Sequence, residues 1–410
     1  MSDELSFLDE DDTPEEKQDG ERWKVLVVDD EEEILEVTRM ALGDFSFKGK
    51  GLELYCASTS NQAKKYLEEH SNIILVLLDI VMEEDDTGLN MVKHIRNDLN
   101  NFEVRIVLRT GQPGYAPERE VIVEYDINDY KEKHELTAQK LFTTVVSAIR
   151  SYSDLMEMKK ITSDKERLNS ELNIAREIQF SVMPSNFPLF PERNEFDVLA
   201  HIKPANEVGG DFYDIFLIDE NKVCIFVGDV SGKGIGAAMF MMTCKTLLRR
   251  ELKEHKDPAI ALKQVNQFLF EEKTNVFATI FVAILDFDTN ELLFSNAAHN
   301  PPLLISKDNN VEFMEIPPGY PLTMFYESEY SNMKSSFNKG DYLFIYTDGV
   351  TEAMNPKGDL YSETRLKETM VNLNKASLNI LHEGLLHEVS LFSNTAKQSD
   401  DITILSLKVN

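Results

Sequence analysis

The chain has 410 residues, of which 42% are hydrophobic, and this predicts a globular protein of two or three domains, each with its own apolar core. Its formal net charge at pH 7 is −30, which argues against a nucleic-acid partner because phosphate backbones are bound by clustered Lys and Arg. Residues 1–20 are dominated by Asp and Glu and contain almost nothing apolar. They are predicted to form a disordered solubilising tail, with a docking segment as the alternative.

The first residues lack the basic and apolar regions of a signal peptide, and no apolar run approaches the roughly 18 residues of a membrane span. Cys56, Cys224 and Cys244 show neither a pairing nor a metal-type spacing, which favours reduced thiols. We therefore expect a soluble, cytoplasmic protein without membrane contact.

Residues 21–136 alternate short apolar runs with helical stretches, the pattern of a doubly wound α/β domain with a five-stranded parallel sheet. Function in such a sheet lies at the carboxyl ends of the strands. A fifth strand is expected near Lys133, after four that are predicted at Lys24–Val28, Leu52–Ala57, Ile73–Leu78 and Val104–Leu108.

Polar residues stand at or near these expected strand ends, namely Asp29, Asp30, Asp79, Thr110 and Lys133. Three carboxylates around one point suit a single Mg²⁺ ion, while a hydroxyl and an ammonium can hold the oxygens of an arriving phosphoryl group. The groups in this order are far more specific than one acid at a strand end.

This region resembles the receiver domain of bacterial response regulators. The resemblance implies a sensor histidine kinase as the phosphoryl donor. It also implies a phosphoacceptor, Asp79, a set of Mg²⁺ ligands, Asp29, Asp30 and Asp79, and a set of phosphate-sensing or switch residues, Thr110, Tyr130 and Lys133.

The sequence departs from the receiver pattern in three places. Glu83 follows Met82 where the family usually has Pro, His134 replaces the Pro usual after the Lys, and the segment 111–114 is atypical. A receiver fold that no longer accepts phosphate is therefore the alternative.

Residues 137–183 contain no Gly or Pro and are predicted to form one long helical linker that ends before Pro184. Spacings of three and four define a heptad seam with two polar interruptions: Met158, Ile161, Lys165, Leu168, Leu172, Ala175, Gln179 and Val182. The seam is compatible with a parallel dimeric coiled coil, and also with a single helix whose stripe packs on its own C-terminal domain.

Residues 184–410 are dominated by strand-like runs. Strands before and after a helical pair predict two sheets with helices packed outside, an α+β sandwich. The helical stretches are expected near Gly236–His255, Pro258–Glu272, Thr364–Leu373 and Leu378–Ser393.

Four short aspartate motifs are spread over this half of the chain: GGDFYD at 209–214, GDVSGKG at 228–234, TDG at 347–349 and SDDIT at 399–403. Three of them adjoin apolar runs, at Val223–Val227, Tyr342–Tyr346 and Ile402–Leu407. Strand ends that deliver carboxylates to one place form an oxygen-ligand cage for hard divalent cations, which offset the repulsion between the acids. The motifs therefore predict metal-assisted hydrolysis.

Together with NAAHNPP at 296–302, these motifs resemble, in order, the RsbU/SpoIIE-like branch of the metal-dependent PPM serine/threonine phosphatases. The resemblance implies two Mg²⁺ or Mn²⁺ ions, with Asp229 bridging them and Asp211 bound through water. It implies Asp229, Asp348 and Asp400 as the catalytic acids. The full implied ligand set is Asp211, Asp229, the carbonyl of Val230, Asp348, Asp400 and, as a weaker candidate, Asp401.

Two residues of these motifs keep two roles open. Lys233 fits a surface position or a contact to the substrate phosphate. His299, in a Pro-rich turn, fits a structural role or that of a general acid.

The whole chain is thus predicted to be a two-component response regulator whose output is dephosphorylation of phosphoserine or phosphothreonine on a protein. The resemblance implies a phosphorylated anti-sigma-factor antagonist of the STAS type as substrate. Phosphorylation at Asp79 is expected to control the output, and the heptad seam predicts a homodimer through residues 137–183. Two rivals remain: a pseudophosphatase adaptor that binds a sigma factor or similar partner, and a phosphorelay module in which only Asp79 has chemistry.

Overall fold

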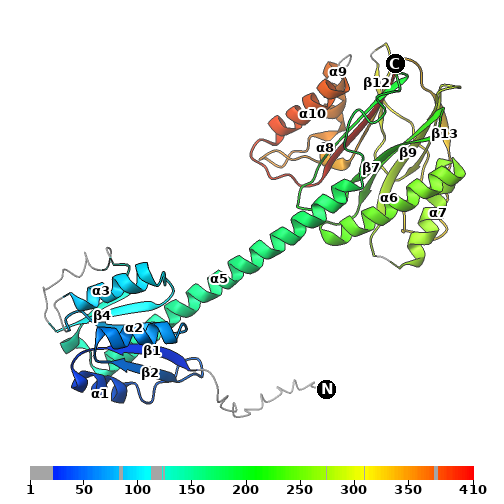
Figure 1. Cartoon of the computed structure of the whole chain (residues 1–410). Coiled ribbons are helices and arrows are strands. Elements are labelled where there is room, and N and C mark those ends of the chain that lie inside the picture. Colours follow the sequence, from blue (N-terminus) through cyan, green and yellow to red (C-terminus); the bar gives the residue numbers. More distant parts are fainter. Residues whose placement is uncertain are drawn as a thin grey trace, which may run out of the picture. The chain divides into compact units, whose positions relative to one another are not determined.

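A computed structural model describes residues 22–82, 86–111, 122, 125–273, 275–308, 310–373 and 377–410. The predicted acidic tail lies outside the described residues, and so do Glu83 and most of the atypical segment 111–114. The chain divides into two compact units, Met1–Glu166 and Arg167–Asn410 (Figure 1). The division falls within a single helix of 44 residues, α5 (Ala138–Ser181), which confirms the predicted long helix.

The first unit contains a parallel sheet of five strands in the order β2-β1-β3-β4-β5, as predicted. The strands are β1 (Trp23–Val28), β2 (Leu52–Ala57), β3 (Leu75–Asp79), β4 (Arg105–Thr110) and β5 (Asp129–Glu132). Asp79 and Thr110 are the last residues of β3 and β4, because the pairing continues through Asp79 with Arg109 and through Thr110 with Glu132. The predicted ends of these two strands were therefore too early.

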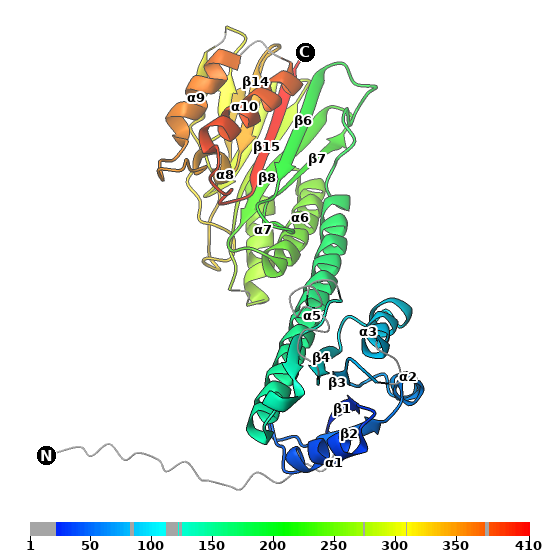
Figure 2. The same cartoon turned by 90° about the vertical axis from the view of Figure 1, so that its left-hand side faces the viewer.

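Helices cover both faces of this sheet (Figure 2). One face packs against Ala63 and Leu67 of α2 and Val92 of α3, whereas the other packs against Leu35 of α1 and Val145 of α5. Among the described residues, the helical elements before α5 are α1 (Glu32–Ala41), α2 (Ser60–Glu69), α3 (Thr87–Lys93), a π-helical turn (His94–Asp98) and a 3-10 turn (Lys133–Glu135).

The second unit contains two antiparallel sheets that pack face to face. Their orders are β13-β10-β9-β8-β7 and β12-β11-β14-β15-β6. The first comprises β7 (Phe212–Asp219), β8 (Lys222–Val230), β9 (Ala278–Asp286), β10 (Glu291–Ala297) and β13 (Met333–Ser336). The second comprises β6 (Phe196–Lys203), β11 (Leu303–Ile305), β12 (Val311–Phe313), β14 (Tyr342–Tyr346) and β15 (Ile402–Val409).

The predicted α+β sandwich is confirmed by the position of the core. Buried Phe226 and Phe281 of one sheet and Leu343 and Leu405 of the other belong to the same apolar cluster. Helices α6 and α7 cover the first sheet from outside, and α9 and α10 cover the second (Figures 1 and 2). The helices are α6 (Ile235–His255), α7 (Pro258–Glu271), α8 (Asp348–Thr351), α9 (Ser362–Leu373) and α10 (Leu378–Ser393).

Among the described residues, no helix is both long and apolar enough to span a membrane. Cys56, Cys224 and Cys244 are free thiols, and the last two are buried in the second unit.

Asp214 anchors α6 on the first sheet of this sandwich. Its fully buried carboxylate accepts hydrogen bonds from Lys245 Nζ at 2.8 Å and from Arg249 Nη1 at 2.9 Å. Arg249 also lies over the ring of Phe216, 4.8 Å from its centroid. This acid of the GGDFYD motif is therefore fully paired within the core and faces α6.

We expect Asp214→Ala to lower the free energy of unfolding by about 3–5 kcal/mol, because it leaves two cations without a partner in or beside the core. Asp219→Ala, which removes an exposed pair with Lys256, is the matched control and should cost about 0.2–1 kcal/mol. Urea unfolding followed by circular dichroism measures both. Fluorescence of Trp23, the only tryptophan, monitors the first unit, and its transition should not move.

Candidate active site

Both sheets of the second unit carry two acids at one end. Phe212 pairs with Gly228, so Asp211, just before β7, lies beside Asp229 near the end of β8. In the other sheet Tyr346 pairs with Ile404, so the segments that carry Asp348, just after β14, and Asp400, just before β15, leave that sheet at the same end. The antiparallel pairing within each sheet thus places its two acids at the same end of that sheet, although Asp348 and Asp400 are 52 positions apart in the chain.

The acids of the two pairs interact electrostatically, as the pKa of Asp229 indicates. Burial, and then the charge of Asp348, raise the pKa of Asp229 to about 7. Burial, and then the charges of Glu352 and Asp400, raise the pKa of Asp348 to about 6. Burial, and then the charge of Asp229, raise the pKa of Asp211 well above its ordinary value. Each shift reports an acid that is costly to ionise in the protein alone.

Few groups in the described ranges offset this repulsion. The Thr347 hydroxyl donates a hydrogen bond to Asp211 Oδ2 at 2.8 Å. The Lys233 ammonium lies 3.0 Å from Asp400 Oδ2. No other Lys or Arg among the described residues forms an ion pair with the four acids.

The donor set fits hard divalent cations. The buried carboxylates raise one another's pKa values, and one exposed ammonium is their charged partner. Negative charge at the site is therefore left uncompensated. The carbonyl oxygen of Val230 lies against Gly210, since a Cβ atom built on that glycine would be 2.7 Å from this oxygen. The carbonyl oxygen therefore lies next to the residue that directly precedes Asp211. Carboxylate and carbonyl oxygens are the ligands that Mg²⁺ and Mn²⁺ take.

Asp401 differs from the other acids because it holds the loop before β7. Its Oδ1 accepts from the backbone N–H of Ala205, and its Oδ2 accepts from the N–H of Gly210, each at 2.8 Å. A side chain at Gly349 would collide with the carbonyl oxygen of Asp401, so a glycine is required there for the close approach of the two segments. Both carboxylate oxygens of Asp401 thus accept backbone hydrogen bonds that position the loop before β7.

His299 has a structural position. It is 3% exposed, and its Nδ1 lies 2.9 Å from the hydroxyl of Thr279. Its backbone N–H donates to Asn296, whose side-chain amide in turn donates to the carbonyl of His299. Burial lowers the pKa of its imidazole to about 4, so the ring is neutral at pH 7. These contacts favour the structural role over that of a general acid.

The first unit has a separate acidic pocket at the carboxyl ends of its strands. Carboxylate oxygens of Asp29, Asp30 and Asp79 lie within 4.8 Å of one another. Lys133 Nζ contacts Asp79 at 2.7 Å and Asp29 at 3.2 Å. Burial raises the pKa of Asp79 although Lys133 opposes the rise, and Oδ1 of Asp79 has no hydrogen-bond partner among the described residues. Thr110 is the last residue of β4 and Tyr130 lies within β5, and both side chains are buried.

Arg109 is a member of this pocket that the sequence analysis missed. Its guanidinium, with its side chain 3% exposed, lies 3.1 Å from Asp29 Oδ2 and also donates to the Thr38 hydroxyl of α1 at 3.1 Å. An Arg within a run of apolar residues, directly before Thr110, was the available signal, because a charge inside a buried strand requires a partner.

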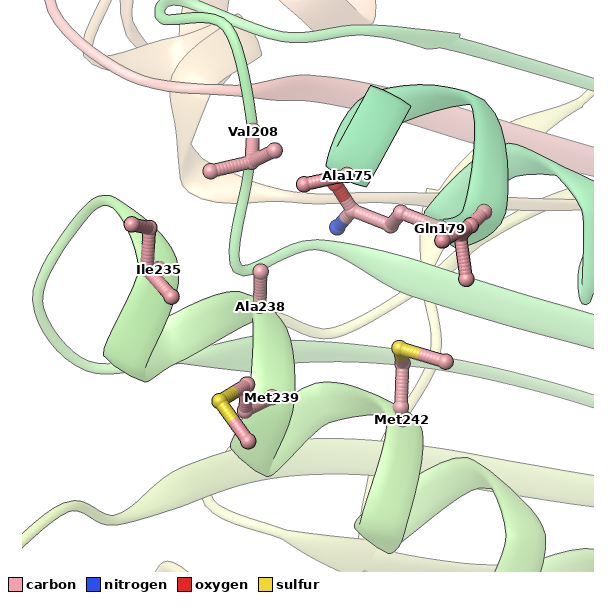
Figure 3. A pocket seen from close by; sticks show the side chains of 8 residues that line it. Ala175, Gln179, Val208, Ile235, Ala238, Met239 and Met242 are labelled. Atoms are coloured by element: carbon pink, nitrogen blue, oxygen red, sulfur yellow. The ribbon is translucent and has the colours of Figure 1, made fainter. Parts of the chain in front are cut away.

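Gln179 was predicted as a polar interruption of the helical seam, but its side chain faces the second unit. It is 2% exposed, and its amide donates to the carbonyl of Gly209 at 2.6 Å and accepts from the Gly209 N–H at 3.2 Å. The helix end, Val208 and the first turns of α6 enclose a hollow of about 130 Å³ whose lining is otherwise apolar, with Met239 and Met242 on one side (Figure 3). The hollow itself offers no metal ligands.

Comparisons with known proteins show what the second unit is similar to. Residues 219–410 match the family model described as Stage II sporulation protein E (SpoIIE). The chain is 25% identical over 248 residues to the phosphoserine phosphatase RsbU of Bacillus subtilis, covering 60% of this chain and 71% of that protein. It superposes on the SiaA-PP2C domain of Pseudomonas aeruginosa with a TM-score of 0.55 at 20% identity, over 60% of this chain and 99% of that domain, which shows a shared fold.

A third relative is more similar over a shorter length. The chain is 51% identical over 135 residues to the 3'3'-cGAMP-specific phosphodiesterase 2 of Vibrio cholerae. The match covers 33% of this chain and 26% of the Vibrio protein, so the chain spans about a quarter of that relative's length.

We expect the metal-free protein to lose stability as the pH rises from about 4 to about 7.5, because the folded-state pKa values of Asp229 and Asp348, about 7 and about 6, exceed the unfolded value of roughly 3.9. Protonation of these acids contributes its full stabilisation of the folded state at pH values below the unfolded-state pKa. This stabilisation is lost as the pH rises through the folded-state pKa. Mn²⁺ should therefore stabilise strongly at pH 7.5 and weakly at pH 4.5.

Thermal unfolding in EDTA and in Mn²⁺ at a series of pH values measures this dependence. The double variant Asp229→Asn, Asp348→Asn serves as the control and should show a flatter pH profile in EDTA. Parallel profiles for the wild type and the double variant would contradict the interpretation of the acid cluster.

Proposed function

We propose that this protein hydrolyses phosphoserine or phosphothreonine on a protein substrate in a metal-dependent reaction, because residues 219–410 match the SpoIIE family model and the chain is similar to the phosphoserine phosphatase RsbU. The observation that carries the proposal is the meeting of two acids from each sheet, with raised pKa values and one exposed cation as partner among the described residues. The name of the Bacillus relative, a phosphoserine phosphatase, supports the substrate class.

The catalytic arrangement follows from the donor set. Asp229, Asp348 and Asp400 would hold two Mg²⁺ or Mn²⁺ ions, with the carbonyl of Val230 as a further ligand and Asp211 acting through water. Such ions, when bound, supply a water-derived nucleophile at neutral pH and neutralise phosphate oxygens during in-line displacement.

The chain itself contributes position and rigidity. The Thr347 hydroxyl orients the carboxylate of Asp211, and Asp401 fixes the loop that carries it. Cys224 and Cys244 are buried, in keeping with a mechanism that uses no cysteine nucleophile. These contacts hold the ligands in place before substrate arrives.

The first unit is proposed to be a receiver domain that a sensor histidine kinase phosphorylates at Asp79. The pocket of Asp29, Asp30 and Asp79, with Lys133 at 2.7 Å from Asp79, supports this role and a single Mg²⁺ ion. The proposed protein substrate is a phosphorylated anti-sigma-factor antagonist of the STAS type, so that control of transcription would follow without DNA binding.

A homodimer through residues 137–183 is proposed to link the two activities. Met158, Ile161 and Leu168 of the predicted seam are 69%, 60% and 53% exposed on α5, which supports a helix with an unpartnered apolar stripe. Leu168→Cys in a Cys-free background should form a disulfide-linked dimer on oxidation, and its failure to do so would exclude the parallel coiled coil.

We expect Asp229→Asn to lower kcat on a serine-phosphorylated protein at least about 100-fold, because it removes the acid shared by both metal positions. Phosphate release in Mn²⁺ measures the rate. Asp286→Asn is the matched control, since Asp286 lies in β9 at the opposite end of the same sheet and pairs with Lys222. An unchanged rate in Asp229→Asn would leave the adaptor as the better interpretation.

We expect Asp79→Asn to abolish phosphorylation of the protein by a small phosphodonor such as acetyl phosphate in Mg²⁺, since the acceptor carboxylate is lost. Intact mass spectrometry shows the added phosphoryl group directly. Asp98→Asn, at an acid whose side chain is 70% exposed, should leave the phosphorylation unchanged. Equal phosphorylation of Asp79→Asn and wild type would place the acceptor elsewhere.

A further inference from the structure

Lys233 is the one cation that contacts the acid cluster in the part of the second unit that the structure describes. Its ammonium lies 3.0 Å from Asp400 Oδ2 and also contacts the carbonyl oxygen of Ser399. Its charge also lowers the pKa of Asp348, although burial and the neighbouring acids outweigh it. The ammonium therefore stands at the edge of the proposed metal site, next to two of the proposed ligands.

The pair with Asp400 has little value as a structural element. The Lys233 side chain is 47% exposed and that of Asp400 is 35% exposed, and such pairs add little to stability because water screens them. By contrast, the cations on Asp214 are fixed by burial and by ring contacts. Lys233 can thus leave Asp400 at small cost.

The loop that carries Lys233 has the freedom for such a movement. Gly232 and Gly234 flank it with φ values of 89° and 82°, and Gly236 follows two positions later. No heavy atom lies within 4 Å of the position where a Cβ would stand on any of these three glycines. The backbone on either side of Lys233 therefore borders open space.

Binding of a divalent cation by Asp400 would remove the attraction between its carboxylate and the Lys233 ammonium. The bound cation then neutralises the carboxylate of Asp400. The Lys233 ammonium, on its flexible side chain, is left beside the ligands without this partner. A phosphate group brings up to two negative charges and several acceptor oxygens, the chemistry that a Lys recognises as a point charge. The same ammonium can thus pair with an acid before the metal binds and with a phosphate oxygen afterwards.

We propose that Lys233 binds the phosphoryl group of the substrate, and that in the metal-free protein its ammonium pairs with Asp400 in place of a divalent metal ion. This inference rests on the proposed phosphatase function and assigns a substrate-binding residue to it. It makes two predictions of opposite sign for the same substitution. Loss of the ammonium should strengthen metal binding and weaken phosphate binding.

The full-length variants Lys233→Met and Lys233→Arg test this, with Lys256→Met as the control, because Lys256 forms an exposed pair with Asp219 away from the acids. Calorimetry with Mn²⁺ should show about two- to fivefold tighter binding for Lys233→Met, the effect of removing a competing exposed charge. Calorimetry with inorganic phosphate on the Mn²⁺-loaded protein should show about tenfold weaker binding, and Lys233→Arg should restore most of it. Lys256→Met should match the wild type in both.

Kinetics on the phosphoprotein separates this inference from the proposed function. Lys233→Met should raise KM, or lower kcat/KM, about tenfold or more, while Lys256→Met does not. If the wild type turns over and Lys233→Met keeps its phosphate affinity and KM, Lys233 has no role in substrate binding, and the phosphatase proposal stands. If the wild type fails to turn over, the phosphatase proposal fails, and the phosphate calorimetry still decides whether Lys233 binds phosphate.

Discussion

The repulsion among acids gathered at one end of a sandwich is the constraint around which the second unit is organised. Asp211, Asp229 and Asp348 all have raised pKa values because burial and their neighbours disfavour their charge. The surrounding structure responds with donors that carry no charge, such as the Thr347 hydroxyl on Asp211 and the backbone N–H groups on Asp401. It leaves the remaining charge for a divalent cation to neutralise.

Two acids three positions apart in one motif show how local geometry divides the roles. Asp211 precedes β7 and faces the other acids, whereas Asp214 lies within β7 and faces α6, where Lys245 and Arg249 pair with it. One carboxylate is thus paired with cations within the protein, and the other is not. The first holds the helix on the sheet, and the second is available to a ligand.

In the acidic pocket of the first unit, the side chains of Lys133 and Arg109 offset the repulsion between the acids. Lys133 contacts Asp79 and Asp29, and Arg109 contacts Asp29 from the side of α1. This pocket therefore holds more of its neutralising charge within the chain than the second site does. This difference in fixed charge agrees with the proposal of one metal ion in the first pocket and two in the second.

The sequence by itself predicted most of the elements and the positions of the acids. Alternation of apolar runs and helices predicted the parallel sheet. The aspartate motifs predicted which acids would gather at strand ends, because three of the four motifs adjoin an apolar run typical of a strand. The tertiary structure alone decided the partners. It showed that Asp401 hydrogen-bonds to backbone groups, that Gln179 contacts Gly209 and that Arg109 reaches Asp29, since each contact joins segments whose spacing leaves no local pattern. It also placed Lys233 on Asp400, a pair 167 positions apart that no periodicity marks, because long-range pairing depends on how the two sheets meet.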